Sequence, residues 1–416
     1  MARKKRELPA ALREAGLTED TLDALVAGVH TQAEFDVVFQ GLKKALTERI
    51  LRAELTEHLG YPDGAPRPAE TRNARNGTTP KTVLTESGAL PLEIPRDRES
   101  SFAPLFVPKG VRRLPGFDQK VLSLYARGLT VRELQAHLEE CYAVPVSAEL
   151  ITAVTDEVLQ EVQAWQQRPL EPVYVAVVFD ALRLKIRDEG LVQHKAVHLA
   201  LGITASGEKE VLGFWIAQSE GAAFWQRVLS ELQGRGVRDI LIAMIDGLTG
   251  FPAAIEAVFP ATVIHQCVVH LVRQSLVHVS WTERKPVTAK LRAIYQAPSE
   301  AAARTALEEF AESPLGRRHP EIATLWTRHW ERIAPALAYP FPVRRVLYST
   351  NAIESLHRTL RKSLKIRGHF PTDDAASKLL YLALRNAAPK LGPPREWRLA
   401  MQHITLLFGD RVPMIE

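Results

Sequence analysis

The stretch VYVAVVFDALRLKI, residues 173–186, decides how the rest of the chain is interpreted. Seven mostly apolar residues precede Asp180, and a continuous apolar run of this length is typical of a buried strand. Asp180 is therefore expected at the lip of a buried strand or inside it. A buried carboxylate without a partner is costly, so Asp180 needs one. The ordinary alternative is an aspartate at a strand end that is satisfied by local backbone N–H groups.

The residues after this strand predict a mixed α/β core. Val, Ile, Leu and aromatic residues recur in short runs, and the turn sequences DEG and ASGEK separate the first three runs. We expect these three strands to be antiparallel neighbours. The predicted order is strand, strand, strand, helix, strand, helix, strand, at residues 173–186, 194–204, 210–218, 221–237, 238–247, 250–259 and 261–269.

A second aspartate, Asp246, follows the apolar run LIAMI. It stands at the carboxyl end of a buried strand, which is the edge where open α/β sheets place their ligand sites. The alternative is a simple turn, because Asp246 precedes Gly247 and Asp-Gly is a common turn pair. Taken alone, this segment favours the turn.

A third carboxylate, Glu354, lies in the predicted helix YSTNAIESLHRTLRKSLKIRG, residues 348–368. At about 100° per residue, one apolar stripe is formed by Ile353, Leu356, Leu360 and Leu364. The flank of that stripe carries Glu354, Arg358, Arg361 and Lys365. An ion pair between Glu354 and Arg358 would be worth about 0.3–0.5 kcal/mol and would explain the glutamate. It would not explain why so many basic side chains lie close together. An anionic partner such as a DNA backbone would relieve the repulsion between them.

Three carboxylates on separate elements suit a two-metal phosphoryl-transfer site. Two Mg²⁺ ions about 3.5–4 Å apart can hold the attacking and leaving oxygens of an in-line displacement. Hard divalent ions prefer oxygen ligands and keep several waters, so few carboxylates suffice. The chain has no GxGxxG, P-loop, GxSxG or CxxC pattern that would favour another chemistry.

The chain has 416 residues, 24% of them charged, and a formal net charge of +5. This composition is typical of an ordinary globular protein. Its two cysteines, Cys141 and Cys267, are too few for a disulfide framework and suit a reducing cytosol. The basic start MARKKRELPA is not followed by an apolar signal segment, and no apolar run is long enough to span a membrane. We therefore expect a cytosolic protein.

The region before residue 116 divides into two predicted parts. Residues 1–60 have helical periodicity, and residues 61–115 form a basic arm with a possible β-hairpin around Ser87-Gly88. Between residues 61 and 113 there are nine Lys or Arg and six acids. A solvated, partly irregular segment is one interpretation. The other is an arm that follows a phosphate backbone, with Arg72 and Arg75 as candidate contacts.

Residues 116–168 predict three helices with short joints. Thr130 and Glu133 form a capping-box pattern, and Ser147 can cap the third helix. Short helices with a tight joint resemble helix-turn-helix DNA-binding units, although a plain helical linker has the same pattern. We favour DNA binding here, with Arg132 as a candidate contact.

Several long motifs resemble a known family. The order of strands, with aspartates at the first and fourth and a glutamate on a later helix, resembles the RNase H-like core of DDE transposases. The amino-acid sequence of residues 72–397 is similar to that of transposases of the Mutator-like family of bacterial insertion sequences. The matching motifs include GFDQKVLSLYARGLTVREL, SEGAAFWQRVLSELQGRGVRDILIAMIDGLTGFPAAIEAVFP, HQCVVHLVRQSL and YSTNAIESLHRTLRK.

The resemblance implies metal-dependent cleavage and joining of DNA at terminal inverted repeats. It carries the catalytic triad onto Asp180, Asp246 and Glu354, which would hold two Mg²⁺ or Mn²⁺ ions. The gap of 108 residues between Asp246 and Glu354 implies an inserted all-helical domain, predicted at residues 270–340. The RNase H-like core would then comprise residues 169–269 and 341–416.

Two further features come with the resemblance. Its Cys-x-x-His motif matches Cys267 and His270, and a zinc site would need two more ligands, of which His265 supplies at most one. A structural or substrate-positioning role is therefore favoured. Trp281 could stack on an unpaired base, although packing in a core is the favoured interpretation.

The expected partners are double-stranded DNA, as inverted repeats and as target, and further copies of the chain in a homodimer or higher homo-oligomer. No membrane is expected, and the protein would lie in the bacterial cytoplasm, on the nucleoid when bound to DNA. Two rival interpretations are a catalytically silent DNA-binding protein derived from a transposase and an RNase H-like nuclease that joins nothing.

Overall fold

The computed structural model describes residues 10, 14, 16–142, 146–246, 250–348, 351–364, 367–394 and 396–413. The chain forms two units, one of residues Met1–Leu124 and Val131–Val154 and the other of residues Tyr125–Thr130 and Thr155–Glu416. The fold is mixed α/β with many helices, as predicted. The division into six regions predicted from the sequence stays a prediction.

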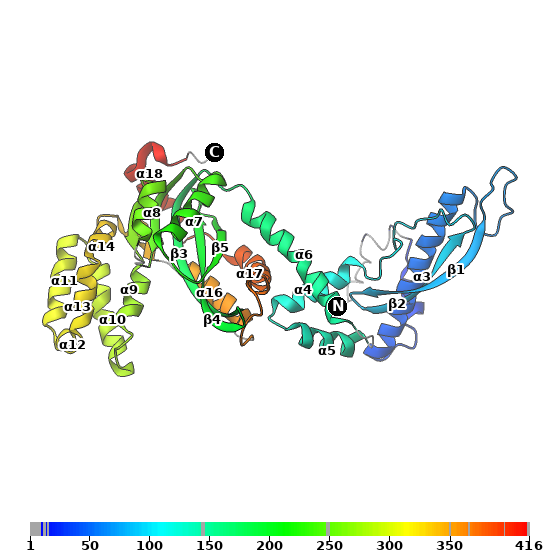
Figure 1. The fold of residues 1–416 in the computed structure, drawn as a ribbon, viewed down its shortest axis with the longest axis horizontal. Coiled ribbons are helices and arrows are strands. Elements are labelled where there is room, and N and C mark those ends of the chain that lie inside the picture. Colours follow the sequence, from blue (N-terminus) through cyan, green and yellow to red (C-terminus); the bar gives the residue numbers. More distant parts are fainter. Residues whose placement is uncertain are drawn as a thin grey trace, which may run out of the picture. The chain divides into compact units, whose positions relative to one another are not determined.

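The first unit is built on a β-hairpin covered by a long helix (Figure 1). Its strands pair antiparallel with Thr85 opposite Gly88, which confirms the hairpin predicted around Ser87-Gly88. The long helix begins with a capping box and buries Leu51 in an apolar cluster with the hairpin strands. The elements of this unit are α2 (Glu19–Val26), α3 (Gln32–Leu59), β1 (Arg75–Thr85), β2 (Gly88–Asp97), most of α4 (Pro115–Ala126), α5 (Val131–Tyr142) and the start of α6 (Ala148–Gln167).

The second unit is organised by a five-stranded mixed sheet in the order β5-β4-β3-β6-β7. The first three strands along the chain are antiparallel neighbours, whereas β6 pairs parallel with both β3 and β7. The predicted strands and their order are therefore confirmed. Their bounds are β3 (Val173–Asp188), β4 (Leu191–Ile203), β5 (Lys209–Ala217), β6 (Asp239–Ile245) and β7 (Val263–Gln266).

One face of this sheet is covered by α7 (Ala222–Gly234) and α8 (Phe251–Val258) (Figure 1). The rings of Trp225 and Phe251 stack with centroids 3.6 Å apart, and Phe179 packs edge-on against both. Large aromatic surfaces are thus removed from water on this side.

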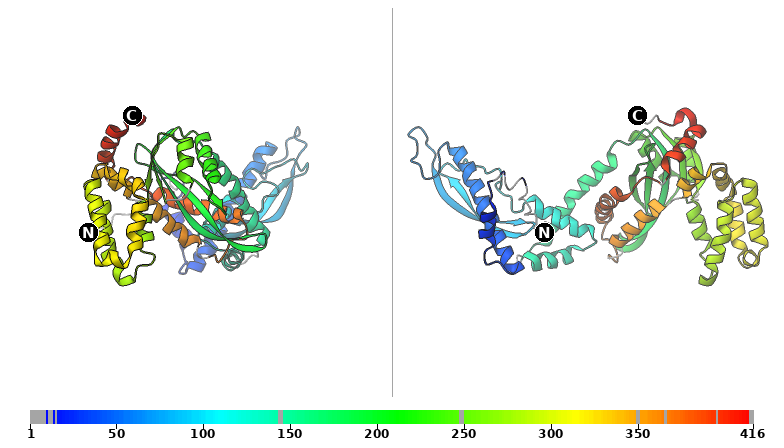
Figure 2. Two further views of the ribbon diagram at one scale, coloured as in Figure 1. Left: turned by 60° about the vertical axis from the view of Figure 1, so that its left-hand side comes forward. Right: turned by 180° about the vertical axis from the view of Figure 1, so that it is seen from behind.

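The described segment between β7 and the last helices contains helices and no strand, as predicted, and Figure 2 shows its helices gathered beside one another. Trp326 and Trp330 lie in its own apolar core. Its helices are α9 (Val268–Ser275), α10 (Trp281–Tyr295), α11 (Glu300–Glu312), α12 (Pro314–Arg318), α13 (Pro320–Arg328) and α14 (Trp330–Leu337).

Trp326→Ala is expected to lower the free energy of unfolding by about 3–5 kcal/mol, because it empties a fully buried site. It also removes the hydrogen bond that the Trp326 Nε1 donates to Ser275 Oγ at 3.0 Å. Chemical denaturation measures the loss. Trp281→Ala is the matched control, since that side chain is 83% exposed and its loss should change stability by less than about 0.5 kcal/mol. Equal losses in the two variants would contradict the assignment of the core.

The chain then returns to the sheet. Residue Phe370 forms a bridge with Ile186 of β3, and Lys195 of β4 pairs with Asp188 and Asp373. The returning helices are α15 (Phe341–Tyr348), α16 (Asn351–Leu364), α17 (Asp373–Ala387) and α18 (Trp397–Phe408). In the described part of the chain, no helix is both long and apolar enough to cross a membrane.

Candidate active site

The two aspartates stand at the same level on neighbouring strands. Strands β3 and β6 pair in parallel with Val178 opposite Met244, an offset of 66 residues along the chain. The same offset separates Asp180 from Asp246, which directly follows the last residue of β6. Asp180 lies inside β3, because that strand continues to Asp188. Gly247, the second residue of the alternative turn pair, lies outside the described residues.

Both aspartates belong to the face of the sheet opposite α7 and α8. Successive side chains on a strand point to opposite faces. Phe179 and Ile245, the residues just before the two aspartates, belong to the apolar cluster with those helices. Asp180 and Asp246 are therefore expected to share the other face, where α16 packs against β3.

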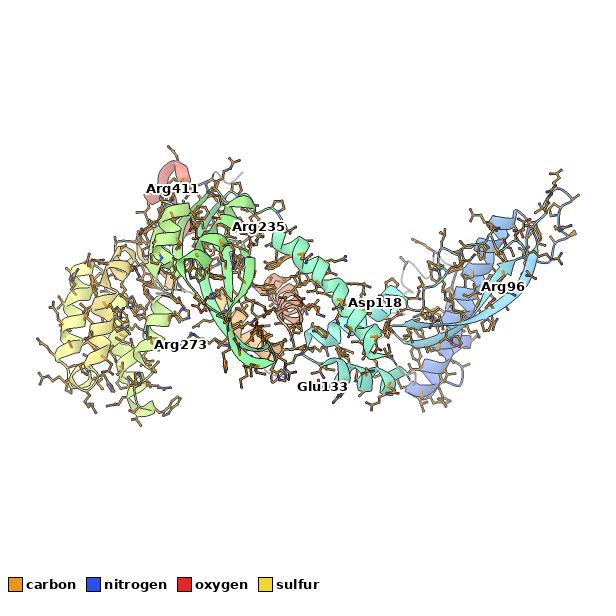
Figure 3. All side chains as sticks on the ribbon, in the orientation of Figure 1. Arg96, Asp118, Glu133, Arg235, Arg273 and Arg411 are labelled. Carbon is orange, nitrogen blue, oxygen red and sulfur yellow. The ribbon has the colours of Figure 1, made fainter. Side chains whose placement is uncertain are left out.

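Two helices bring four more polar side chains to this face. On α9, His270 Nε2 lies 3.2 Å from Asp180 Oδ1, and on α16 His357 Nδ1 lies 3.2 Å from Asp180 Oδ2. One turn along the same two helices, Arg273 pairs with Glu354 (Arg273 is labelled in Figure 3). These contacts place Glu354 one helical turn from His357, which lies against Asp180.

The two histidines on Asp180 differ in charge. Burial opposes the charge of His270, but its hydrogen bond to Asp180 and the nearby Cys267 raise the pKa of His270 to about 10. Burial lowers the pKa of His357 to about 4 against the pull of Asp180. Burial would raise the pKa of Asp180, yet His270 and His357 together lower it. Asp180 is thus an ionised carboxylate between one charged and one neutral histidine.

The raised pKa of His270 predicts a stability change at alkaline pH. A histidine whose pKa rises on folding stabilises the fold fully below its unfolded pKa of about 6.5. That contribution is lost as the pH rises through about 10. We expect the free energy of unfolding, measured by denaturation in a metal chelator, to fall across this window.

His270→Gln should flatten that fall. His194→Gln is the matched control, because His194 is exposed on β4 and should leave the profile of the wild-type protein unchanged. A His270→Gln variant that keeps the full alkaline loss of stability would contradict the assigned charge.

Asp246 has a different environment. Burial raises its pKa, and the negative charges of Asp180 and Glu220 act in the same direction against His270. Glu220 also lies 3.7 Å from the buried His198 of β4. Several carboxylates therefore lie at one edge of the sheet, and their negative charges are only partly balanced by His270. A cation at this edge would relieve their repulsion.

The oxygen donors fit hard divalent cations such as Mg²⁺ or Mn²⁺. Among the residues that the structure describes, however, no three His, Cys, Asp or Glu side chains are arranged to hold a metal ion. Both oxygens of Asp180 face histidines, and Glu354 faces Arg273. Metal binding at Asp180 and Glu354 therefore requires these contacts to break.

Comparison with known proteins identifies the family. The sequence pattern described as "Transposase, Mutator family" matches residues 17–391. The chain belongs to the Mutator family of transposases. Membership in this family implies a DNA-processing enzyme.

Several relatives of this transposase are similar over nearly their whole length. The chain is 52% identical over 398 residues to a protein of Sinorhizobium fredii (strain NBRC 101917 / NGR234) described as a probable transposase for insertion sequence element ISRM3-like, covering 95% of this chain and 99% of the relative. It is 52% identical over 400 residues to the ISRM3 transposase of Rhizobium meliloti (strain 1021), with the same coverage of 95% and 99%. A probable transposase for an insertion sequence element of Corynebacterium diphtheriae is 45% identical over 338 residues, covering 76% of this chain and 98% of the relative.

Two of the basic residues predicted around Glu354, Arg358 and Arg361, line one hollow of about 340 Å³ in this transposase. Arg358 and Arg361 are exposed there, and Arg273 of α9 also lines the hollow. The alternative interpretation predicted an ion pair between Glu354 and Arg358. In the structure, Glu354 instead pairs with Arg273. Lys365 lies outside the described residues.

The other predicted contacts differ in their surroundings. Arg75 donates to Thr56 and to the Tyr61 carbonyl and stacks over the Tyr61 ring, so its guanidinium holds the first unit together. Arg72 is exposed before β1, and Arg132 is exposed on α5. Their role on DNA stays a prediction.

The Cys-x-x-His motif is part of the site in this structure. Cys267 is buried at the N-terminus of α9, one turn from His270, and its N–H donates to the Ile245 carbonyl at the end of β6. His265 instead bonds the Tyr339 hydroxyl at 3.2 Å. This geometry supports a positioning role for the motif.

Trp281 is not part of a core. It is 83% exposed at the first position of α10, with the Arg284 guanidinium over its ring. The expectation that it packs in a core is wrong, and its stacking on a base stays a prediction.

Sequence reasoning missed His357, Arg273 and Glu220. The first two have a signal: His357 follows Glu354 by three residues, and Arg273 follows His270 by three. Residues three apart on a helix share a face. Glu220 stands in a loop after β5, and no spacing pattern connects it to the site.

Proposed function

We propose that this transposase binds the terminal inverted repeats of an insertion sequence and cleaves and joins DNA strands by DDE chemistry in an RNase H-like core. The names of the relatives support the biological role. The sheet order and the placement of the three carboxylates support the chemistry. We further propose that the protein acts on double-stranded DNA in the bacterial cytoplasm, and that it does so as a homodimer or higher homo-oligomer.

Asp180, Asp246 and Glu354 would hold two Mg²⁺ or Mn²⁺ ions, which supply activation of the attacking oxygen and stabilisation of the leaving oxygen. His270 and His357 hold the Asp180 carboxylate in place through its two oxygens. Arg358 and Arg361 offer exposed guanidinium groups to the phosphates of the strand being cut.

One observation carries this proposal. The register of β3 with β6 gives Asp180 and Asp246 the same level on neighbouring strands, and Glu354 lies one helical turn from His357, which contacts Asp180. Purified protein should be incubated with DNA carrying an element end and Mg²⁺, and its products resolved. Cut and joined strands are expected. Cutting without joining would favour a nuclease, and binding without cutting would favour a silent DNA-binding protein.

The hairpin of the first unit supports the expected phosphate contacts. A hollow of about 700 Å³ lies along β1 and β2, and its basic lining residues are Lys81, Arg96, Lys109 and Arg112 (Arg96 is labelled in Figure 3). Burial lowers the pKa of Lys81, and the positive charge of Arg112 lowers it further. An anion between these groups would relieve their repulsion, and a DNA backbone supplies one.

The double variant Arg96→Gln, Arg112→Gln is expected to weaken DNA binding for all sequences alike. Each lost phosphate contact should reduce the slope of log affinity against log salt by about 0.9. Titrations at several salt concentrations measure this slope. Arg304→Gln, on a helix of the second unit with its own partner Glu300, is the control and should leave the slope unchanged. An unchanged slope in the double variant would remove the hollow from the DNA interface.

A further inference from the structure

Strands β3 and β4 run on together past the other strands of their sheet. The pairing of β3 with β6 ends at Val178, whereas β3 and β4 stay paired as far as Asp188 and Leu191. On its other side, β4 pairs with β5 only from Ala196 onward. Residues 181–195 therefore form a two-stranded ribbon that no other strand flanks.

One face of this ribbon carries a row of three cations. Arg183, Lys185 and Arg187 occupy alternate positions of β3, and all three are exposed. Alternate residues of a strand share one face and lie about 6.8 Å apart. We call these three residues the basic row. The residues that pair with them on β4 are Ala196, His194 and Val192, none of which is acidic.

The other face of the ribbon is turned toward the fold. Ile186 is fully buried there and forms a bridge with Phe370. Lys195 is also buried and pairs with Asp188 and Asp373. These contacts anchor the ribbon on one side. They leave the face with the basic row free in the part of the chain that the structure describes.

The charges of the basic row are not balanced by the fold. Among the described residues, none of its three cations forms an ion pair. The acids nearest along the ribbon lie beyond its two ends: Glu189 is in the turn after β3, and Glu220 lies 3.7 Å from His198. Repeated like charges repel one another, and a polymer with repeated negative charges relieves that repulsion. A DNA backbone is such a polymer.

The position of the basic row indicates which DNA it meets. Residues 180 and 183 belong to opposite faces of β3, because they are an odd number of positions apart. The face of Asp180 is the one on which α16 packs, with Arg358 and Arg361 assigned to the strand being cut. The basic row therefore contacts a different length of DNA. Arg183 is nevertheless only about 10 Å from Asp180 along the strand, which is less than the width of a major groove, about 12 Å.

We propose that the basic row holds the phosphate backbone of the target DNA into which the cut end is joined. The inference rests on the proposed function and goes further by naming the surface that takes the second DNA. Contacts to phosphates position a duplex without selecting its sequence. The face with the basic row carries no Asn or Gln, the amide side chains that read adenine. Both features suit a target that is bound by its charge.

The test is strand transfer from a pre-cut end into a plasmid of unrelated sequence, with the full chain. The triple variant Arg183→Gln, Lys185→Gln, Arg187→Gln should raise the target concentration for half-maximal joining about tenfold or more. The slope of log affinity against log salt for an unrelated duplex should fall by about 0.9 for each lost contact. Cleavage of an uncut end should stay within about twofold of the wild-type rate, because the row does not hold that strand. Circular dichroism should show an unchanged fold, since all three side chains are exposed.

Two further variants serve as controls. The triple variant Arg304→Gln, Arg318→Gln, Arg385→Gln removes the same charge from exposed cations that already have partners in Glu300, Glu283 and Glu161. It should join strands like the wild-type protein. Arg183→Lys with Arg187→Lys keeps the charge of the row and should also join normally, because a point charge suffices to bind a phosphate.

The outcomes separate this inference from the proposed function. Normal joining by the variant without the basic row would overturn the inference, while cleavage and joining by the wild-type protein would leave the proposed function intact. An equal loss of cleavage and joining would also overturn it, because the row would then serve the end DNA or the fold. A wild-type protein that neither cuts nor joins DNA would refute the proposed function, and this inference with it.

Discussion

Asp180→Asn is expected to abolish strand cleavage while leaving DNA binding largely intact. The substitution keeps the shape of the side chain but removes the negative charge that two cations require. We expect the cleavage rate to fall on the order of 10³-fold or more, which corresponds to about 4 kcal/mol in activation free energy. Single-turnover cleavage of end DNA in Mg²⁺ measures the rate, and gel-shift titration measures binding.

The control for this variant is Asp188→Asn. Asp188 lies on the same strand and pairs with Lys195 at 3.1 Å, so its loss tests whether any carboxylate of β3 has the same effect. We expect near-normal cleavage. The Asp180→Asn protein must also be shown folded, because its substitution leaves His270 without a charged partner. Full cleavage by a folded Asp180→Asn variant would remove Asp180 from the active site.

The core of the second unit was predictable because its strands are long apolar runs separated by turn residues. The five strands and the two helices between them occur in the predicted order. The interval of 66 residues between Asp180 and Asp246 acquires a physical meaning in the structure, since it equals the register of the parallel pair. Sequence periodicity alone contains no register, because strand pairing depends on contacts between distant segments.

The partners of the three carboxylates were not predictable to the same degree. Glu354 pairs with Arg273, 81 residues earlier in the chain, rather than with a neighbour on its own helix. Helix periodicity assigned Glu354 to the flank of the apolar stripe but could not say which helix would pack there. The exposure of Trp281 has a similar cause, since an aromatic residue at a helix start has no periodic signal of its own.

The first half of the chain shows another limit. Local patterns identified the hairpin and three helices, all of which occur. The boundary between the two units falls inside α6, whose first residues belong to one unit and whose later residues belong to the other. Composition changes mark where helices begin, but they do not reveal which core each turn of a continuous helix joins.

Glu354→Gln is the variant that separates a metal ligand from an ordinary surface ion pair. If Glu354 only balances Arg273, then Glu354→Gln and Arg273→Gln should behave alike, because an exposed ion pair contributes about 0–1 kcal/mol to stability. If it is the third metal ligand, Glu354→Gln should lower cleavage on the order of 10²-fold or more, whereas Arg273→Gln should keep most of it. The expected result is the second, read from single-turnover cleavage of the same end DNA.

The Arg273→Gln variant makes this comparison decisive in either direction. Removing the guanidinium frees the Glu354 carboxylate, so less Mg²⁺ should be needed for half-maximal cleavage. A Mg²⁺ titration of the cleavage rate in both variants measures this shift. Equal loss of cleavage in the two variants would show that the Arg273–Glu354 pair acts as a structural unit. In that case the third ligand must be sought among the other carboxylates at this edge of the sheet. Glu220 is the candidate, because its negative charge raises the pKa of Asp246.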